Sequence, residues 1–166
     1  MNINKDIQLD VEATGERILG RWADIRRSTR RVIEEKQLFK QEGLSMEKHR
    51  ELVLKQLKTL VDSGATKYGF QTELGGQMTP GGALSSFEEL VFADPSLQIK
   101  QGVQYGLFSS AILYLGTEHH YKAFLPGAVN FEVPGAFAMT ETGHGSDVAS
   151  IGTTATYDPA TEEFII

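Results

Sequence analysis

The sequence of 166 residues contains no cysteine, which excludes disulfide bonds, thiolate chemistry and cysteine-based metal sites within this chain. No apolar run approaches the roughly 20 residues of a membrane-spanning helix, so we expect no membrane span. The first residues, MNINKDIQLDVEATGER, are too polar for a secretory signal, and we expect no export. Apolar residues make up 40% and charged residues 23%, which is ordinary for a domain with a hydrophobic core.

Positive charge is scarce beyond the first third of the chain. Residues 1–60 have a balance of +3, whereas residues 61–166 have a balance of −9. The basic stretch RRSTRRVIEEK would fit nucleic acid, but it is short, contains acids and lacks aromatic residues. Arg30 and Arg31 each precede a glutamate by four residues, which is typical of a solvated helix face. We therefore expect no nucleic-acid partner.

Apolar periodicity predicts helices over most of the chain. The first runs from Glu12 to about Leu38, and the second begins after an N-cap at Ser45 and stops at Gly64. The first helix has one apolar stripe, made of Ile18, Trp22, Ile25, Thr29 and Val32. The second has one apolar face, made of Leu52, Val53, Leu57, Leu60 and Val61.

The most apolar helix is predicted over Ser96–Leu115, with Asp94 as N-cap, Pro95 at its first position and Gly116 at its end. Its small residues suit close helix packing, and they would also suit the wall of a narrow ligand channel. From the residues alone, packing is the simpler explanation. The preceding stretch ALSSFEELVFA predicts a helix with Leu84, Phe87 and Val91 on one side.

A further helix follows an N-cap at Thr117, and Pro126 is predicted to end or kink it. Beyond Pro134 the period shortens, and AFAM, IGTTATYD and EEFII predict strands, with a turn at Asp158–Thr161. The sequence thus predicts a mainly α chain: a helical domain over residues 1–134, then the first strands of an incomplete β domain over residues 135–166. We expect the rest of that β domain to lie outside this sequence.

The loop MTETGHGSD, residues 139–147, is the strongest candidate for ligand binding. Gly143 and Gly145 permit positive φ and close approach of a ligand, while Thr140 and Ser146 supply hydroxyl groups. Loop N–H groups of this kind can bind anions, which suits the carbonyl and phosphate oxygens of a nucleotide cofactor. On residue types alone, an ordinary glycine-containing turn explains the loop better, because it matches neither a G-x-G-x-x-G nor a Walker motif.

Other titratable residues indicate no catalytic constellation. His119 and His120 are adjacent and do not share a helix face, so they are poor joint metal ligands. His49, Glu88 and Glu89 are predicted to lie on solvated helix surfaces. We therefore predict no metal site and no base–nucleophile pair in this chain.

The order of the residues indicates more about function than the residue types do. The stretch from Leu115 to Ile166 resembles the junction of the helical and β domains in the acyl-CoA dehydrogenase and oxidase superfamily, whose Thr-Glu and Gly-x-Gly-Ser positions are filled by TETGHGS. LGG at residues 74–76 and EELVFADPSL at residues 88–97 resemble the upstream helical domain. His144 and TTATYDPATEEFII point to the oxidase branch, whereas Asp147 is the residue that many dehydrogenases carry.

The resemblance implies an up-and-down helical domain before a β-barrel-like middle domain, with FAD as cofactor. It implies conversion of fatty acyl-CoA to trans-2-enoyl-CoA during β-oxidation, with molecular oxygen reduced to hydrogen peroxide. Five residues would contact the flavin: Phe137, Met139, Thr140, Gly145 and Ser146. Ser146 would also approach the pantetheine end of the substrate, Glu141 would orient the loop, and the acyl chain would run beside helix Ser96–Leu115.

In this family the catalytic carboxylate lies beyond the position of Ile166, so we expect no catalytic residue, no turnover and little or no FAD retention in this fragment. The full-length protein would be a homo-oligomer in the bacterial cytoplasm, or in the peroxisome of a eukaryote. Two alternatives remain: an acyl-CoA dehydrogenase that passes electrons to a flavoprotein, and a non-catalytic helical binding module.

Overall fold

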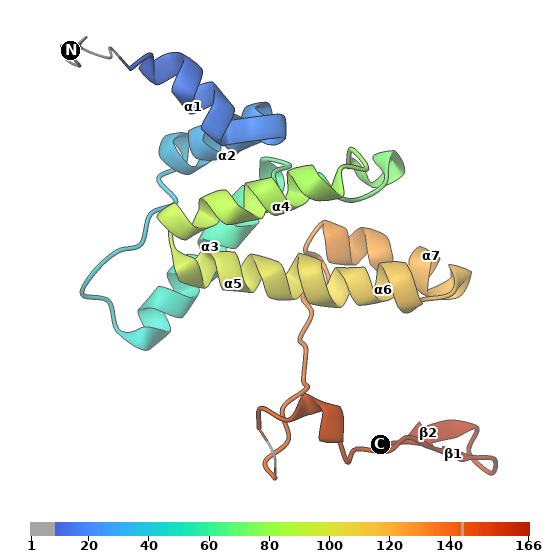
Figure 1. The fold of residues 1–166 in the computed structure, drawn as a ribbon. Coiled ribbons are helices and arrows are strands. Elements are labelled where there is room, and N and C mark those ends of the chain that lie inside the picture. Colours follow the sequence, from blue (N-terminus) through green and yellow to red (C-terminus); the bar gives the residue numbers. More distant parts are fainter. Residues whose placement is uncertain (1–8, 144) are drawn as a thin grey trace, which may run out of the picture. The chain divides into compact units, whose positions relative to one another are not determined.

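The computed structural model describes residues 9–143 and 145–166 of the chain. The described residues up to Ala136 form one compact unit, which is helical, and Phe137–Ile166 form a second. Figure 1 shows both units, and each is described here by itself. Among the described residues, no helix combines the length and apolar character needed to cross a membrane.

The helical unit is built from α-helices joined by short 3-10 turns, with one π-helical segment, η4. In chain order its elements are α1 (Val11–Leu19), η1 (Gly20–Trp22), α2 (Ala23–Glu35), α3 (Met46–Asp62), η2 (Thr72–Leu74), α4 (Pro80–Glu89), η3 (Leu90–Phe92), α5 (Pro95–Gln101), η4 (Gly102–Ser109), α6 (Ser110–Leu115) and α7 (Glu118–Val129). The second unit contains η5 (Val148–Ser150), β1 (Thr156–Asp158) and β2 (Glu163–Ile165).

The prediction of one long helix from Glu12 to Leu38 is wrong. Helix α1 ends at Leu19 because Gly20 adopts φ = 66°, in the left-handed region that other residues rarely occupy. Chain direction changes through η1, and α2 then runs only to Glu35. Ile18, predicted to be part of the apolar stripe, is 80% exposed as a result.

Helix α3 agrees with the prediction at both ends. The Ser45 hydroxyl accepts a hydrogen bond from Lys48 N at 3.4 Å, and Gly64 has φ = 79° just after the helix ends. Most of the predicted apolar face is buried: Val53, Leu57, Leu60 and Val61.

Helix α4 buries a different face from the one predicted. Leu84 is 59% exposed and Val91, in η3, is 45% exposed. The buried residues of α4 are small or polar: Gly82, Ser85, Ser86 and Glu89. Because small side chains let helices approach closely, α4 packs on α2 through a hydroxyl pair, Thr29–Ser86, with 2.8 Å between the oxygens.

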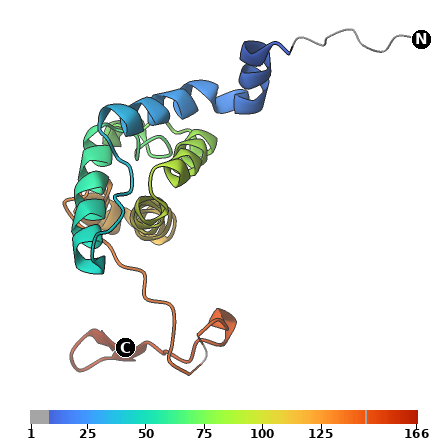
Figure 2. The same cartoon turned by 90° about the vertical axis from the view of Figure 1, so that its left-hand side faces the viewer.

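The segments α5, η4 and α6 continue one another, as predicted for the most apolar helix. The Asp94 carboxylate accepts from Ser96 N at 2.8 Å, which confirms the N-cap. The eight residues of η4 are π-helical, and the hydroxyls of Ser109 and Ser110 each donate to a carbonyl five residues earlier at 2.8 Å. Figure 2 shows this helix nearly end-on.

Thr117 caps α7 through a capping box, as expected, but Pro126 does not end the helix, which runs on to Val129. Leu125, Ala128 and Val129 are buried around it. Their packing offsets the cost of a proline in a helix, which is about 3 kcal/mol.

The second unit contains a short antiparallel hairpin in which Tyr157 faces Phe164 across β1 and β2. Asp158 accepts from Ala160 N at 2.8 Å, which confirms the predicted turn. AFAM, residues 136–139, is not a strand, because it has no pairing partner among the described residues. A mainly α chain with short strands near its end is nevertheless confirmed.

Candidate functional site

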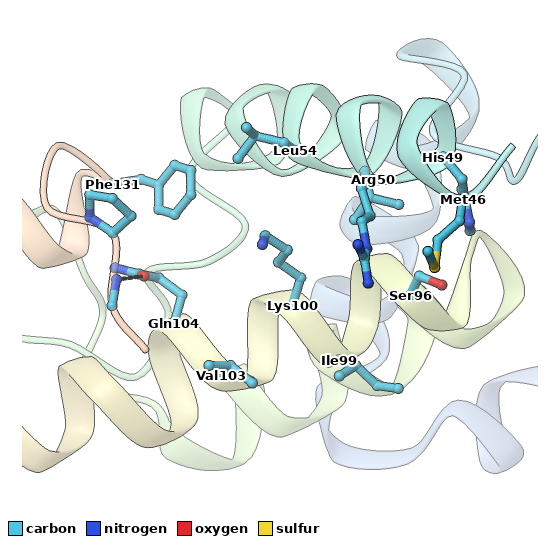
Figure 3. Close-up of a pocket in the computed structure, with 13 residues that line it drawn as sticks. Met46, His49, Arg50, Leu54, Ser96, Ile99, Lys100, Val103, Gln104 and Phe131 are labelled. Carbon is cyan, nitrogen blue, oxygen red and sulfur yellow. Dashed lines mark hydrogen bonds between the residues drawn. The ribbon is translucent and has the colours of Figure 1, made fainter. Parts of the chain in front are cut away.

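A pocket of about 740 Å³ lies between α3 and the α5–η4 helix (Figure 3). Its α3 wall consists of Met46, His49, Arg50, Val53 and Leu54. The opposite wall consists of Ser96, Ile99, Lys100, Val103 and Gln104, and one end is formed by Phe131, Pro134 and Gly135. This pocket lies along the helix beside which the acyl chain was expected.

Polar and apolar groups are mixed along the pocket. Figure 3 shows Arg50 and Lys100 extending from opposite walls into the space between them. Phe131 lies at one end, beyond Leu54. The two cations thus lie in the middle of the pocket, between Leu54 and Phe131 on one side and Met46 and His49 on the other.

His49 lies beside Met46 at one end of the pocket and pairs with a buried acid. Its Nε2 lies 2.7 Å from Asp94 Oδ2, and its side chain is 23% exposed, so the predicted position on a solvated surface is wrong. Burial by itself raises the pKa of Asp94, but the hydrogen bonds from His49 and Ser96 N outweigh it and hold that pKa below its ordinary value. Asp94 therefore links the cap of α5 to a residue of α3.

Gln104 fixes the opposite end of the pocket. Its amide nitrogen donates to Ala128 O at 2.9 Å and to Val133 O at 3.1 Å, and its Oε1 accepts from Gly135 N at 2.7 Å. Sequence reasoning missed this residue. The available signal was a glutamine within the most apolar helix, since a buried amide must find partners.

A second hollow of about 560 Å³ lies between α4 and the same long helix. It is lined mainly by apolar or small residues, among them Phe70, Ala83, Leu84, Phe87, Gly102, Gly106, Leu107 and Leu113. Tyr105 also lines it, and burial raises the pKa of that phenol to about 12. Small residues of the long helix thus line a hollow in addition to making packing contacts.

Glu89 is a buried charge rather than the predicted solvated one. It is 1% exposed, and its carboxylate lies 3.0 Å from Arg26 Nη1 and 2.5 Å from Arg30 Nε. Burial alone raises the pKa of Glu89, but the hydrogen bonds from Arg30 and Arg26 outweigh it and lower the pKa. The carboxylate thus acts as an ion-pair partner between α2 and α4.

The residues expected at the flavin lie on the second unit. Phe137 and Met139 are 46% and 42% exposed, and Thr140, Gly145 and Ser146 are also exposed. A Cβ built at Gly145 would lie 3.8 Å from Thr140 Cγ2, so the loop brings these two residues together. No described contact joins Phe137, Met139 or Ser146 to them. His144 lies outside the described residues.

Glu141 links the loop at residues 139–147 to the residues that follow it. Its carboxylate accepts hydrogen bonds from Gly152 N at 2.9 Å, from Thr153 N at 2.8 Å and from the Thr153 hydroxyl. The Thr153 hydroxyl and the two N–H groups lower the pKa of Glu141. This arrangement agrees with the expected role of Glu141 in orienting the loop.

The donor set of the loop suits an oxygen-rich ligand. In the part of the chain that the structure describes, Thr140, Gly145 and Ser146 form no hydrogen bonds with protein groups. Their N–H groups and two hydroxyls therefore remain available for carbonyl or phosphate oxygens. The same part of the chain contains no group of three side chains suited to hold a metal ion.

Comparison with known proteins finds one family model and relatives from the same family. Residues 23–132 match the family described as "Acyl-CoA dehydrogenase, N-terminal domain". Acyl-coenzyme A oxidase 3, peroxisomal, from Arabidopsis thaliana is 40% identical over 122 residues, covering 74% of this chain and 18% of that protein. Acyl-coenzyme A oxidase from Komagataella pastoris is 49% identical over 80 residues, covering 46% of this chain and 11% of that protein.

Peroxisomal acyl-coenzyme A oxidase 3 from Homo sapiens is 37% identical over 123 residues, covering 74% of this chain and 17% of that protein. The chain therefore spans less than a fifth of the length of these relatives. No solved structure matches the chain.

Proposed function

This chain belongs to the acyl-CoA dehydrogenase N-terminal domain family, and from this premise we propose that it is the N-terminal part of an FAD-dependent acyl-CoA oxidase. The observation that carries the proposal is that relatives 37–49% identical to the chain are named acyl-CoA oxidases. The proposed reaction converts fatty acyl-CoA and oxygen to trans-2-enoyl-CoA and hydrogen peroxide, a step of fatty acid β-oxidation.

Each unit has a distinct part in this proposal. In the helical unit, the hollows along α5, η4 and α6 receive the acyl chain. In the second unit, Phe137, Met139, Thr140, Gly145 and Ser146 hold the flavin, with exposed N–H and hydroxyl groups for its oxygens, and Ser146 also approaches the pantetheine. FAD, when bound, supplies the acceptor for the β hydrogen of the acyl group.

The acceptor of the α proton lies outside this sequence in our proposal, and the fragment itself is inactive. Glu141 is poorly suited to act as a base, because hydrogen bonds lower its pKa and occupy its carboxylate. Glu89 and Asp94 are buried, and their pKa values are lowered by their partners. Lowered pKa values make all three weak proton acceptors.

Flavin titration of a longer protein that contains this sequence tests the assignment of the loop. Thr140→Val removes a hydroxyl donor, and we expect FAD affinity to fall about tenfold, the factor that corresponds to one hydrogen bond of about 1.4 kcal/mol. Thr161→Val, in the hairpin turn, is the matched control and should leave the affinity unchanged. Equal affinity of both variants and wild type would remove Thr140 from the flavin site.

Reoxidation separates the oxidase from a dehydrogenase, the alternative that the family name and Asp147 support. We expect stopped-flow mixing of the reduced longer protein with dissolved oxygen to give rapid reoxidation and hydrogen peroxide. Slow reoxidation, with rapid electron transfer to a flavoprotein acceptor, would favour the dehydrogenase. For location we propose the peroxisome if the source is a eukaryote, and a bacterial cytoplasm otherwise.

A further inference from the structure

The hollow of about 560 Å³ between α4 and the α5–η4–α6 helix is lined by buried polar side chains that lack hydrogen bonds. Thr66 and Gln101 both line it, and they are 3% and 8% exposed. Within the described residues, Thr66 Oγ1 has no hydrogen-bond partner and the Gln101 side chain forms no hydrogen bond. These two groups therefore lack the partners that buried polar groups normally have.

Most of the other buried polar side chains are paired within the fold. Gln104 uses both ends of its amide, and the Ser109 hydroxyl donates to a carbonyl at 2.8 Å. Ser85 is also buried without a hydrogen bond among the described residues, but it does not line the hollow. Thr66 and Gln101 differ in that they border open space, so a ligand can supply their missing partners.

Tyr105 places the two groups in the same part of the hollow. It lines the hollow four residues after Gln101 on one helix, so the two side chains share a helix face. Burial raises the pKa of the Tyr105 phenol to about 12, and the Thr66 hydroxyl beside it opposes that shift. The phenol donates to Val129 O at 3.3 Å, which leaves its oxygen free to accept a hydrogen bond.

The remaining lining suits an uncharged, mainly apolar ligand. None of the lining residues that the structure describes carries a charge. Phe70, Phe87 and Leu113 form apolar walls, and Leu84 and Ile99 are 59% and 65% exposed, so the hollow opens to solvent along an apolar rim. Its volume falls in the range of small-molecule sites.

A hydroxyl group is the neutral group that matches Thr66 and Gln101 best. The Gln101 amide offers donors and an acceptor, and the Thr66 hydroxyl can act as either. A ligand hydroxyl can donate one hydrogen bond and accept others, so it can satisfy both residues. A keto or ether oxygen only accepts and would leave Gln101 Oε1 without a donor from the ligand.

We propose that this hollow binds an apolar chain that carries a hydroxyl group, with the hydroxyl between Thr66 and Gln101. A free alcohol and a hydroxylated acyl group of an acyl-CoA both have this chemistry. The second source rests on the proposed function, and in that case Thr66 and Gln101 select for hydroxylated substrates.

Titration of the full 166-residue chain, followed by NMR, tests the site without any enzymatic activity. The probes are 1-octanol, 1-fluorooctane, which has a similar shape but no hydroxyl, and octanoate, which is charged. We expect 1-octanol to bind about tenfold more tightly than 1-fluorooctane, the factor for one net hydrogen bond. The signals of the Gln101 side-chain amide and of the Leu113 methyl groups should shift as it binds.

Gln101→Leu and Thr66→Val remove the polar atoms and nearly keep the size of each side chain. Each should remove most of the preference for 1-octanol and leave the binding of 1-fluorooctane unchanged. Gln98→Leu is the matched control, because Gln98 lies on the same helix outside the hollow and its amide donates to Phe87 O at 3.0 Å. This variant should keep the preference, and circular dichroism checks that all three variants fold.

Equal binding of 1-octanol and 1-fluorooctane, or a preference that survives both substitutions in the hollow, would overturn the proposal. Tighter binding of octanoate than of 1-octanol would overturn it as well, since the lining offers no cation. Loss of 1-octanol binding in a longer protein that contains this sequence would have the same consequence, because later residues would then fill the hollow.

Kinetics of the longer protein separate the two sources of the hydroxyl. With dodecanoyl-CoA carrying a terminal hydroxyl, we expect Gln101→Leu to raise KM about tenfold, while KM for plain dodecanoyl-CoA stays unchanged. Equal changes of both KM values would restrict the site to free alcohols. The proposed function fails separately: 1-octanol binding that depends on Gln101, in a longer protein without flavin, removes only the oxidase.

Discussion

At the scale of single residues, Glu89 places a carboxylate that is 1% exposed between Arg26 and Arg30. The side chains of Arg26 and Arg30 are 23% and 48% exposed, so burial removes water mainly from the carboxylate of Glu89. Such a group stabilises α2 against α4 only while both partners are present, because an unpaired buried charge is costly.

We expect Glu89→Gln to lower the free energy of unfolding by about 2 kcal/mol, less than for a fully buried pair because the arginines remain hydrated. Urea denaturation measures this change. Glu88→Gln is the matched control, since Glu88 is half exposed and pairs with Arg26 at the surface. Its effect should stay below about 0.5 kcal/mol. Equal losses of unfolding free energy in both variants would contradict the stabilising role of the buried Glu89 carboxylate.

Asp94 predicts a dependence of stability on pH. Its pKa is lowered in the folded chain, so its contribution is fully present above the unfolded value of about 4 and is lost as pH falls through the folded value. Asp94→Asn keeps an N-cap acceptor for α5 but removes the charge beside His49. We expect the variant to lose less stability than wild type between about pH 5 and pH 2, measured by urea denaturation. If the stability of the variant and of wild type fell in parallel with pH, this contribution of the Asp94 charge would be excluded.

At the scale of elements, the sequence predicted where helices begin better than where they end or which face they bury. Ser45, Asp94 and Thr117 begin helices as expected, because cap residues satisfy backbone N–H groups through local contacts that the sequence carries. The buried face of α4 was mispredicted because Ser86 pairs with Thr29, far away in the chain. Apolar spacing alone contains no information about that partner.

The candidate site shows the same division. The order of residues in TETGHGS was sufficient to single out the loop, and the apolar composition singled out the helix. The pocket cations were not anticipated, because Arg50 and Lys100 come from different elements and meet only when α3 packs on α5. His49 was misplaced for the same reason, since its partner Asp94 is 45 residues away.

The end of the helical unit offers a test of close packing. A Cβ at Gly135 would overlap the Phe108 ring, whereas a Cβ at Gly106 would meet nothing within 4 Å. We expect Gly135→Ala to cost about 1–3 kcal/mol, as overpacking does, and Gly106→Ala to be neutral or stabilising by up to about 1 kcal/mol. Thermal denaturation of both variants measures the difference. A harmless Gly135→Ala would show that the segment around Gly135 can move away from Phe108.

At the scale of the whole molecule, stability resides in one unit. Every buried apolar residue of the described chain lies at or before Val129, and the second unit contains a sheet of two strands. Because an isolated hairpin is marginally stable in water, the helical unit must supply the cooperative core.

A chain ending at Ala136 should therefore unfold with the same cooperativity and midpoint as the full chain, measured by circular dichroism. A chain ending at Phe131, which removes Val133 and Gly135 as partners of Gln104, is the contrasting variant and should unfold at lower temperature. A large loss of stability on removing Phe137–Ile166 alone would contradict this assignment of the core.

The hydrogen bonds of Glu141 act as a reversible cross-link within a stretch of chain that contains no cysteine. They join residues 12 positions apart and so restrict the conformational entropy of the intervening loop, as a disulfide of the same span would. A disulfide is opened by reductants, whereas this closure is opened by a proton, since protonation of Glu141 removes the negative charge that strengthens the hydrogen bonds its carboxylate accepts. The loop that we assign to the flavin is thus indifferent to thiol redox conditions and sensitive to acid.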